Sequence, residues 1–325
     1  MSNYSKNLSR IIDFSDEILG EASVTRHPQK LYDPINYMFT YRGKQIRSVF
    51  SLLSHDMFGG NIHDFKEFIL SIESLHTFTL MHDDVMDNAN IRRGVPSVNK
   101  KWSNNQSILS GDALLVKSYE YLCLWKLTNK LILQSFTDTA IKVCEGQQLD
   151  LDFSDQEEIS LDEYFGMIEL KTSALIQLAL VVPTLLNSNL KNKNVDLMSR
   201  IGLLLGRLFQ IQDDYLDLYG DELDFGKSIG GDIYEKKKTA LYVRALVCAN
   251  EQDRKRLKAI YNSNDPNKLE VIHQIYAQFQ VKEYAEDLIR ALYQDILSLI
   301  SQIGVPEKNK SPFLEFLDII LNRNS

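Results

Sequence analysis

Hydrophobic residues recur every three or four positions along almost the whole chain. In one run they occupy positions 65, 68, 69, 72 and 75, and in another positions 203, 204, 208 and 211. This spacing places an apolar stripe along one side of an α-helix. Turn-forming residues interrupt the pattern at 59–61, 93–96, 187–194, 226–231 and 262–267. We therefore expect a series of helices, each roughly 15 to 25 residues long.

The same pattern predicts an all-α protein. One segment, Ala174 to Leu186, is apolar on more than one face and is expected at the centre of the fold. No Pro-, Ser- or Gly-rich linker divides the chain, and no repeat period is present. Residues 1–325 are therefore expected to form one large single-domain helical bundle.

The composition agrees with long helices joined by short connections. Fifteen Gly and seven Pro in 325 residues fall below the usual shares of about 7% and 5%, which leaves few turns for an all-β fold. With 44% hydrophobic and 25% charged residues, the chain can bury a full core, and intrinsic disorder is excluded. Forty-four acidic and 36 basic side chains give a net charge of -8, so no nucleic-acid partner is expected.

The cysteines and the most apolar segments indicate where in the cell the protein is expected. The three cysteines are far apart and show no CxxC spacing, which predicts neither a disulfide framework nor a zinc site. A reducing, cytoplasmic location is expected. The first apolar stretch holds three acidic residues between positions 13 and 17, and the run 175–186 is interrupted by Gln177 and Pro183. Neither a signal peptide nor a membrane span is therefore expected.

Two segments contain the pattern Asp-Asp-x-x-Asp. They are Asp83 to Asp87 and Asp213 to Asp217, and two such patterns have a chance probability of roughly 1%. In a helix, the first and last aspartates of each pattern are about 40° apart around the axis and one turn apart along it. Both carboxylates then point the same way, which is unfavourable between like charges unless a cation compensates.

A divalent cation is the best candidate for that compensation. Magnesium is typically bound by one or two carboxylates together with waters and substrate phosphate oxygens. Each pattern could instead be a solvated acidic surface. The flanks argue against that alternative, because Asp83 and Asp213 interrupt strongly apolar stretches where an unpaired charge is costly. His76, seven residues before Asp83, lies on the same predicted helix face.

Basic residues near both patterns suggest further sites for phosphate. Arg92 and Arg93 follow the first pattern, and Gly43-Lys44-Gln45-Ile46-Arg47 precedes it. After the second pattern come Gly226-Lys227 and a lysine run at 236–238. Arginine binds phosphate bidentately, whereas lysine acts as a point charge. The lysine run could equally be a solvated surface.

Together these residues resemble the trans-isoprenyl diphosphate synthases, or polyprenyl synthetases, which join isopentenyl diphosphate to an allylic diphosphate. The resemblance extends from Gly43 to about Thr239 and matches both the order and the spacing of the segments. Further matching segments are Gly111-Asp112, Gly146-Gln147 with Asp150-Leu151, and Lys171-Thr172. Three positions depart from the family pattern: Ser48 and Ser228 replace common prolines, and Lys236 replaces a common glycine.

The resemblance implies a helical bundle around a central apolar cavity and a magnesium-assisted condensation that makes a short-chain product. The allylic substrate would be dimethylallyl, geranyl or farnesyl diphosphate. The residues that would ligate magnesium directly are Asp83, Asp87 and Asp213. Those that would be further ligands or supports are Asp84, Asp214 and Asp217. The residues that would neutralise the allylic diphosphate are Arg92, Lys171, Lys227 and Lys237. Those that would hold isopentenyl diphosphate are Lys44, Arg47, His76 and Arg93.

The resemblance also implies how the reaction ends and how the chain assembles. The C–O bond of the allylic substrate would ionise, and the oxygen dipoles of Thr172 and Gln210 would stabilise the carbocation. The double bond of isopentenyl diphosphate would then attack, and a proton would pass to the diphosphate leaving group. A homodimer is expected, because apolar residues on more than one helix face need cover that one bundle does not supply.

Three other functions were weighed. A terpene cyclase would ionise the same substrate, but the second full aspartate pattern and the Lys44/Arg47 pair favour condensation with a cosubstrate. A non-catalytic partner subunit would be expected to lack some of the six aspartates, and all six are present. A calcium-binding structural protein is disfavoured because no DxDxDG loop occurs.

Product length depends on residues just before the first aspartate pattern. In short-chain members of the family, an aromatic residue five positions before the pattern, here Phe78, is associated with a pocket floor. Ideal helix geometry places Phe78 about 140° from Asp83, and Thr79 only about 40° away. Phe78, Thr79 or the rings of Tyr119 and Tyr121 could therefore close the pocket. Geranylgeranyl diphosphate is the first expectation for the product, and farnesyl diphosphate the second.

Overall fold

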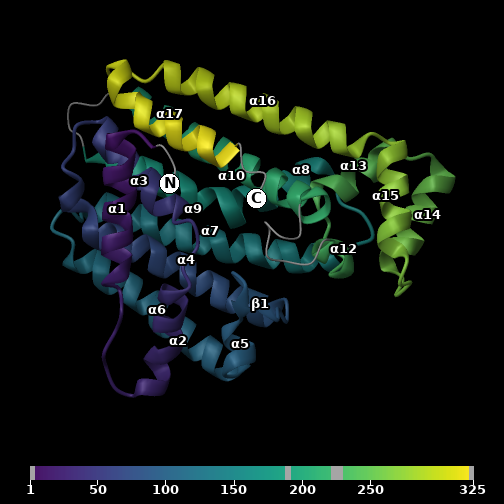
Figure 1. Cartoon of the computed structure of the whole chain (residues 1–325), viewed down its shortest axis with the longest axis horizontal. Helices are drawn as coiled ribbons and strands as arrows, with labels where there is room; N and C mark the ends of the chain where they lie inside the picture. The colour runs from purple at the N-terminus through teal and green to yellow at the C-terminus, as the bar shows by residue number, and fades with distance from the viewer. Residues whose placement is uncertain (1–3, 187–191, 221–229, 322–325) are drawn as a thin grey trace. The chain divides into compact units, whose positions relative to one another are not determined.

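The computed structural model of the chain describes residues 4–186, 192–220 and 230–321. These residues are almost entirely helical (Figure 1), which confirms the all-α prediction. Among them, the only strands are β1 (Ile91–Arg92) and β2 (Val95–Pro96), which pair as a short antiparallel hairpin. This hairpin contains the turn that the sequence predicts at residues 93–96.

The remaining elements follow one another along the chain. The first half of the chain forms α1 (Lys6–Gly20), α2 (Gln29–Thr40), α3 (Ile46–Met57), η1 (Ile62–Phe65), α4 (Lys66–Met86), α5 (Val98–Lys101), α6 (Asn104–Leu124) and α7 (Lys130–Asp155). The second half forms α8 (Leu161–Ile168), η2 (Glu169–Ser173), α9 (Ala174–Leu185), α10 (Asn192–Tyr219), α12 (Gly231–Tyr234), α13 (Ala240–Cys248), α14 (Glu251–Asn262), α15 (Lys268–Gln278), α16 (Val281–Ser301) and α17 (Glu307–Leu321).

Contacts along the chain group into two compact units. Unit 1 comprises residues 1–141, 175–202 and 302–323, and unit 2 comprises residues 142–174, 203–301 and 324–325. Each unit contains one of the two aspartate patterns. The expectation of a single domain stays a prediction.

In unit 1, α4 and α6 pack together along their length. The predicted apolar stripe of α4 is fully buried, with Phe68, Ile72 and Leu75 at 0% exposure. Serines tie the two helices by donating to backbone carbonyls, from Ser71 Oγ to the Ser118 oxygen at 2.8 Å and from Ser107 Oγ to the Met81 oxygen at 2.9 Å. Helix α3 also packs against α4, so the middle of α4 is enclosed from two sides.

Helix α9 is buried as the sequence predicts. Pro183 lacks an N–H, so the carbonyl four residues before it, that of Ala179, loses its helical donor. The Ser51 hydroxyl of α3 replaces that donor at 2.8 Å. The segment Leu161–Leu185 is long and apolar enough to cross a membrane, but 56% of its most apolar window is buried inside the protein. That burial is typical of a core helix.

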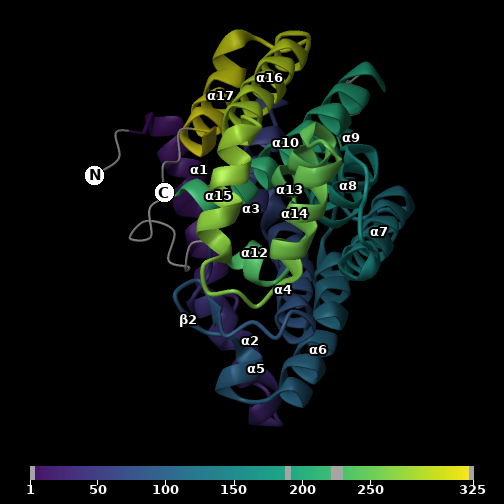
Figure 2. The same cartoon turned by 90° about the vertical axis from the view of Figure 1, so that its right-hand side faces the viewer.

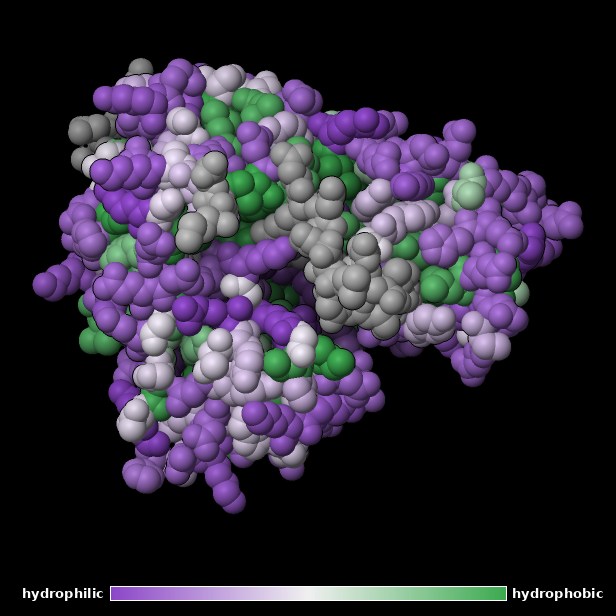
Figure 3. Space-filling model, in the orientation of Figure 1, coloured by the Kyte–Doolittle hydropathy of each residue, from purple (hydrophilic) through white to green (hydrophobic). Residues whose placement is uncertain are grey.

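Unit 2 is built around tyrosines and aliphatic side chains. Tyr242, Tyr261 and Tyr276 are at most 1% exposed and belong to one apolar cluster. Two of their parent helices, α14 and α15, lie side by side (Figure 2). The face of the molecule seen in Figure 3 is mainly hydrophilic, with scattered apolar side chains. This agrees with the 25% of charged residues in the sequence.

Candidate active site

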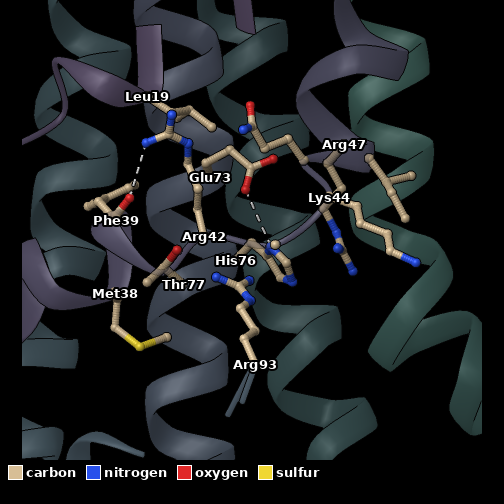
Figure 4. Close-up of a pocket in the computed structure, with 13 residues that line it drawn as sticks. Leu19, Met38, Phe39, Arg42, Lys44, Arg47, Glu73, His76, Thr77 and Arg93 are labelled. Carbon is tan, nitrogen blue, oxygen red and sulfur yellow. Dashed lines mark hydrogen bonds and ion pairs between the residues drawn. The ribbon is translucent and has the colours of Figure 1, made fainter. Parts of the chain in front are cut away.

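A pocket in unit 1 gathers the residues predicted to hold isopentenyl diphosphate. Lys44, Arg47, His76 and Arg93 all line it (Figure 4). They come from three places: the segment before α3 and its first turn, the middle of α4, and the β1–β2 turn. Two further charged residues line the same pocket. We call this set the basic pocket: Arg42, Lys44, Arg47, Glu73, His76 and Arg93.

Left-handed backbone positions bring two of these segments together. Arg93 and Gly94 have φ values of 56° and 74°, and they form the two-residue turn of the hairpin, in which Arg92 pairs with Val95. A Cβ atom on Gly43 would lie 3.0 Å from the Arg93 side chain, so glycine leaves room for this arginine. Arg93 Nη1 in turn donates to the Tyr41 carbonyl at 3.1 Å.

Arg47 is the most deeply buried cation of the basic pocket. Its burial lowers the pKa of the guanidinium to about 10, because the charge of Glu73 offsets only part of the cost and Arg93 adds repulsion. Arg47 therefore remains charged at neutral pH. Its Nε atom is buried and has no hydrogen-bond partner among the described residues. An anion in the pocket would supply the missing acceptor.

Glu73 is a pocket residue that the sequence analysis did not identify. Its Oε1 accepts hydrogen bonds from the Ser48 backbone N–H at 3.2 Å and from the Ser48 hydroxyl at 2.5 Å, while its Oε2 lies 3.5 Å from His76 Nδ1. Burial would raise the pKa of Glu73, but His76, Ser48 and Arg47 outweigh that effect and lower it to about 2. Its place one turn before His76 was the only available hint. Ser48 stands where the family commonly has proline, which has no N–H to donate.

The first aspartate pattern lies at the C-terminal end of α4. Asp83 and Asp87 are partly exposed, whereas the side chain of Asp84 is 0% exposed. Arg92 donates to Asp84 Oδ1 through Nε at 2.9 Å and through Nη2 at 2.5 Å. Burial raises the pKa of Asp84, although the Arg92 charge opposes the rise. The three aspartates therefore divide into an accessible pair and a buried member.

The second aspartate pattern, in unit 2, divides in the same way. Asp213 is exposed. Asp214 is buried and accepts hydrogen bonds from the Tyr164 hydroxyl at 2.7 Å, the Gln210 amide at 2.9 Å and the Ala240 N–H at 3.0 Å. Burial raises the pKa of Asp214 to about 6, even though these donors oppose the rise. Tyr164 belongs to no sequence motif, and its only signal is a tyrosine in an apolar helix.

Asp217 and its neighbour Asp232 complete this cluster. Asp217 is 6% exposed and accepts a hydrogen bond from the Asp232 backbone N–H at 3.1 Å. Burial raises the pKa of Asp232 well above its usual value, and the charges of Asp217 and Asp214 add to the rise. Asp217 and Asp214 are thus held by protein donors, and the exposed Asp213 is the member that faces solvent.

A π-helical turn positions Lys171 and Thr172. Element η2 widens the helix at this point, and such single turns are frequent at functional sites. Lys171 Nζ donates to Asp150 at 2.6 Å, and the Thr172 hydroxyl donates to the Gln210 side-chain oxygen at 3.3 Å. A Cβ on Gly146 would lie 2.3 Å from the Lys171 nitrogen, so glycine permits α7 to approach the turn. The predicted cation-stabilising pair is therefore in contact.

The lysines after the second pattern are only partly described. Lys227 and Ser228 lie outside the described residues. Lys237 Nζ lies 2.8 Å from Glu235 and 3.8 Å from Asp232. Lys236 has a φ of 60°, in the left-handed region that favours glycine, which explains why the family commonly has glycine there.

The two candidate chain-length residues lie on different faces of α4. The helix is α-helical from Lys66 to Met86, so no distortion turns Phe78 toward the face of Asp83. The Phe78 ring is 4.7 Å from the His82 ring, and both rings lie against Gly111 of α6. The Thr79 hydroxyl donates to the His76 carbonyl at 2.8 Å. A product tail would have to bend round α4 to reach Phe78.

The donor set fits a hard divalent cation. The described residues contain no cluster of three or more His, Cys, Asp or Glu that could hold a metal by themselves. This is compatible with magnesium, which typically takes one or two carboxylates and completes its shell with water and substrate phosphate. Asp84 Oδ2 is buried and without a hydrogen-bond partner in the described part of the chain, beside the Asp87 charge that raises the Asp84 pKa. A nearby cation would relieve that repulsion.

Comparisons with known proteins identify relatives over most of the chain. The family model described as polyprenyl synthetase matches residues 28–279. A short chain isoprenyl diphosphate synthase of Methanothermobacter thermautotrophicus is 34% identical over 86% of this chain and 86% of its own length. A geranylgeranyl diphosphate synthase of Sulfolobus acidocaldarius is 32% identical over 98% of this chain and 97% of its own length.

Solved structures give the same result for the fold. A crystal structure of geranylgeranyl pyrophosphate synthase covers 99% of this chain and 100% of its own, with a TM-score of 0.90 and 33% identity. The geranylgeranyl pyrophosphate synthetase of Pyrococcus horikoshii Ot3 covers 97% and 98%, with a TM-score of 0.89 and 28% identity.

Proposed function

Because the chain belongs to the polyprenyl synthetase family, we propose that the basic pocket and the two aspartate patterns bind the two diphosphates of its reaction. The protein is a trans-prenyltransferase that condenses isopentenyl diphosphate with an allylic diphosphate and makes a short-chain isoprenyl diphosphate. The assignment of each substrate to particular residues is the proposal.

The convergence of four cations in the basic pocket carries the assignment of isopentenyl diphosphate. Lys44 and Arg47 come from one segment and Arg93 from another, and all three line the pocket together with its one carboxylate, that of Glu73. The surplus of positive charge, and the buried Arg47 Nε without a partner among the described residues, favour a multiply charged anion. Since this pocket holds a diphosphate by charge and hydrogen bonds, the isopentenyl double bond stays available for reaction.

We assign the allylic diphosphate to the aspartate patterns and the cations near them. Asp83, Asp87 and Asp213 would hold magnesium, because they are the more accessible members of their patterns. When bound, magnesium would supply positive charge that stabilises the departing diphosphate. Lys171, Lys237, Arg92 and Lys227 would neutralise the remaining charge.

The other residues bear on the carbocation and on the final proton. Thr172 and Gln210 are in contact, and the lone pairs of their side-chain oxygens can face an allylic cation while its charge develops. Asp214 would not act as the base that removes the final proton, because three protein donors already hold it. The departing diphosphate is the better acceptor for that proton.

The separation of the two diphosphate sites is tested by kinetics. Arg47→Ala and Arg93→Ala should raise the KM for isopentenyl diphosphate by about tenfold or more, since each removes a charge-assisted hydrogen bond, and should change the allylic KM much less. Lys171→Ala should have the opposite selectivity. Arg290→Ala, an exposed arginine of α16, is the matched control. Equal effects of all three variants on both substrates would contradict the assignment.

For the product, we propose geranylgeranyl diphosphate, with farnesyl diphosphate as the alternative. Several relatives are named geranylgeranyl diphosphate synthases, and one from Natronomonas pharaonis is named a geranylfarnesyl diphosphate synthase. The preferred starting substrate would be found by incubating the enzyme with labelled isopentenyl diphosphate and each allylic diphosphate in turn. Chromatography of the products then gives the chain length.

A homodimer in the cytoplasm completes the proposal. Leu109, Val116 and Leu124 of α6 are 57%, 69% and 64% exposed and lie on one side of that helix, and Leu131 and Ile141 of α7 are also exposed. Five exposed apolar side chains on consecutive helices of unit 1 favour burial against a second copy. Sedimentation should give a dimer at micromolar concentration, and Val116→Glu should shift it toward monomer.

A further inference from the structure

The contacts of Glu73 give the basic pocket a property beyond charge. Glu73 is buried among cations, so it opposes the binding of any anion there. If it served only to balance charge, its removal would strengthen diphosphate binding. Its hydrogen bonds indicate a different role, because both of its oxygens are directed: Oε1 toward Ser48 and Oε2 toward His76.

We infer that Glu73 is a positioning residue which, with His76, makes the basic pocket take up a proton when a diphosphate binds. This inference rests on the proposed function of the pocket. The Ser48 N–H and hydroxyl fix the Glu73 carboxylate, which leaves Oε2 to accept from His76 Nδ1–H. The nitrogen that carries a proton in a neutral imidazole is set by the hydrogen bond that its ring makes. Here that nitrogen is Nδ1.

The consequence falls on the other nitrogen of His76. With its proton on Nδ1, the neutral ring has only a lone pair at Nε2, and a lone pair repels phosphate oxygen. A diphosphate therefore binds well only if Nε2 becomes protonated. The proton comes from solvent, the resulting imidazolium donates Nε2–H to a phosphate oxygen, and it donates Nδ1–H to Glu73. A carboxylate placed in this way both orients an imidazole and stabilises its cation.

The charges around His76 set the direction of this change. The charged groups that line the pocket with His76 are Arg42 and Lys44 ahead of α3, Arg47 of α3, Arg93 of the hairpin turn, and Glu73 of α4. Burial, together with the charges of Arg47 and Arg93, lowers the pKa of His76 to about 4, against the opposing effect of Glu73. A diphosphate neutralises those cations and adds a negative acceptor, so it raises the His76 pKa. The 3.5 Å contact with Glu73 is long for a hydrogen bond, and it should tighten once the ring is charged.

Calorimetry measures the proton directly. Isopentenyl diphosphate is titrated into the full chain at pH 7, without metal or allylic substrate, in two non-phosphate buffers of different ionisation enthalpy. At this pH a terminal phosphate, with a second pKa of about 6, is already mostly deprotonated, so loss of its last proton would give release, the opposite sign. We expect net uptake of protons, at most one per chain. His76→Asn should abolish the uptake, and His63→Asn, at an exposed histidine, should retain it.

The role of Glu73 is tested with matched variants. Glu73→Gln should reduce proton uptake and raise the KM for isopentenyl diphosphate about tenfold, with the allylic KM and the kcat at saturation much less affected. Ser48→Ala keeps the charge of Glu73 but removes one hydrogen bond to it. It should also reduce proton uptake and raise the KM for isopentenyl diphosphate, by a smaller amount. It provides a second test if Glu73→Gln does not fold. Glu67→Gln, two turns earlier on α4, should behave as the wild type.

The outcomes separate this inference from the proposed function. If the wild type binds isopentenyl diphosphate and turns it over without proton uptake, or if His76→Asn keeps the uptake, the inference is wrong and the assignment of the pocket stands. Tighter binding by Glu73→Gln would also overturn it, since that is the result expected from charge alone. If the wild type neither binds nor consumes isopentenyl diphosphate, the proposed function itself fails.

Discussion

Asp84 and Arg92, eight residues apart, form a buried ion pair in which Nε and Nη2 of the arginine both donate to Oδ1 of the aspartate, at 2.9 and 2.5 Å. The pair fastens the β1–β2 hairpin to the end of α4. Since Arg93 is the next residue and lines the basic pocket, the same contact helps to place Arg93. Within the first aspartate pattern, Asp84 is therefore a structural residue, whereas the proposed ligand-binding role falls to the more accessible Asp83 and Asp87.

Replacing Asp84 should therefore mainly reduce stability, whereas replacing Asp83 should mainly reduce the catalytic rate. Asp84→Ala removes the acceptor of both Arg92 hydrogen bonds at a partly buried site, and we expect it to lower the free energy of unfolding by about 1 to 3 kcal/mol. Asp83→Ala should leave the unfolding free energy nearly unchanged and lower kcat by about 10²- to 10³-fold, as expected when one electrostatic stabiliser is lost. Denaturant unfolding and steady-state kinetics on both variants check this. The same stability loss for both would refute the division of tasks.

Replacing Asp213, the exposed aspartate of the second pattern, should have the same effect on rate and stability as replacing Asp83. Asp213→Ala is expected to lower kcat by about 10²- to 10³-fold with little change in melting temperature. Asp196→Ala, at another exposed position of α10, is the control. If Asp83 and Asp213 serve one substrate, the double variant should lose less than the product of the two single losses. A near-normal rate for both single variants would instead identify the patterns as solvated acidic surfaces.

Metal removal should stop the reaction. We expect excess chelator to abolish turnover and magnesium to restore it, because carboxylates and phosphate oxygens together suit a small hard cation. Calcium, which is larger and less demanding in geometry, should restore turnover poorly. Circular dichroism in chelator should show an intact helical fold. Full turnover in chelator would contradict magnesium ligation by the aspartates.

Acid stability should report the His76 environment. The pKa of His76 is lowered from 6.5 to about 4 in the folded chain, so the unfolded chain binds the proton first as the pH falls. The stabilising contribution is therefore present above pH 6.5 and is lost as the pH falls from 6.5 to 4, by at most about 1.4 kcal/mol per pH unit. Melting curves across this range should show a shallower decline for His76→Asn than for the wild type. His63→Asn should follow the wild type.

Product length should respond to Phe78. The ring is 8% exposed and packs between α4 and Gly111 of α6, so Phe78→Ala should open space there and lengthen the main product by at least one five-carbon unit. The rate should change much less, because Asp83 is on another face of α4. Thr79→Phe should shorten the product. Product chromatography and melting curves on the Phe78→Ala variant test this. An unchanged product, together with a fall of about 3 to 5 kcal/mol in the free energy of unfolding, would show that Phe78 is only a packing residue.

Features that depend on short stretches of sequence were predicted correctly. The helical period of α4 and the burial of α9 follow from the repeat of apolar side chains every 3.6 residues, which is a local property of the chain. The turn at residues 93–96 follows from Gly94 and Pro96. The grouping of Lys44, Arg47, His76 and Arg93 was predicted through the family resemblance, and the geometry of the basic pocket agrees with it.

The sequence by itself thus determined the helical class and the family, and it predicted which charged residues bind the substrates. Only the tertiary structure decided what each charge does, because burial and hydrogen-bond partners depend on residues that are far apart in sequence. Asp83 and Asp84 are neighbouring aspartates of one pattern, and only the structure distinguishes them: Asp84 is buried and paired with Arg92, whereas Asp83 is partly exposed. Glu73 shows no pattern along the chain, and it becomes part of the site because α3 places Ser48 and Arg47 against it.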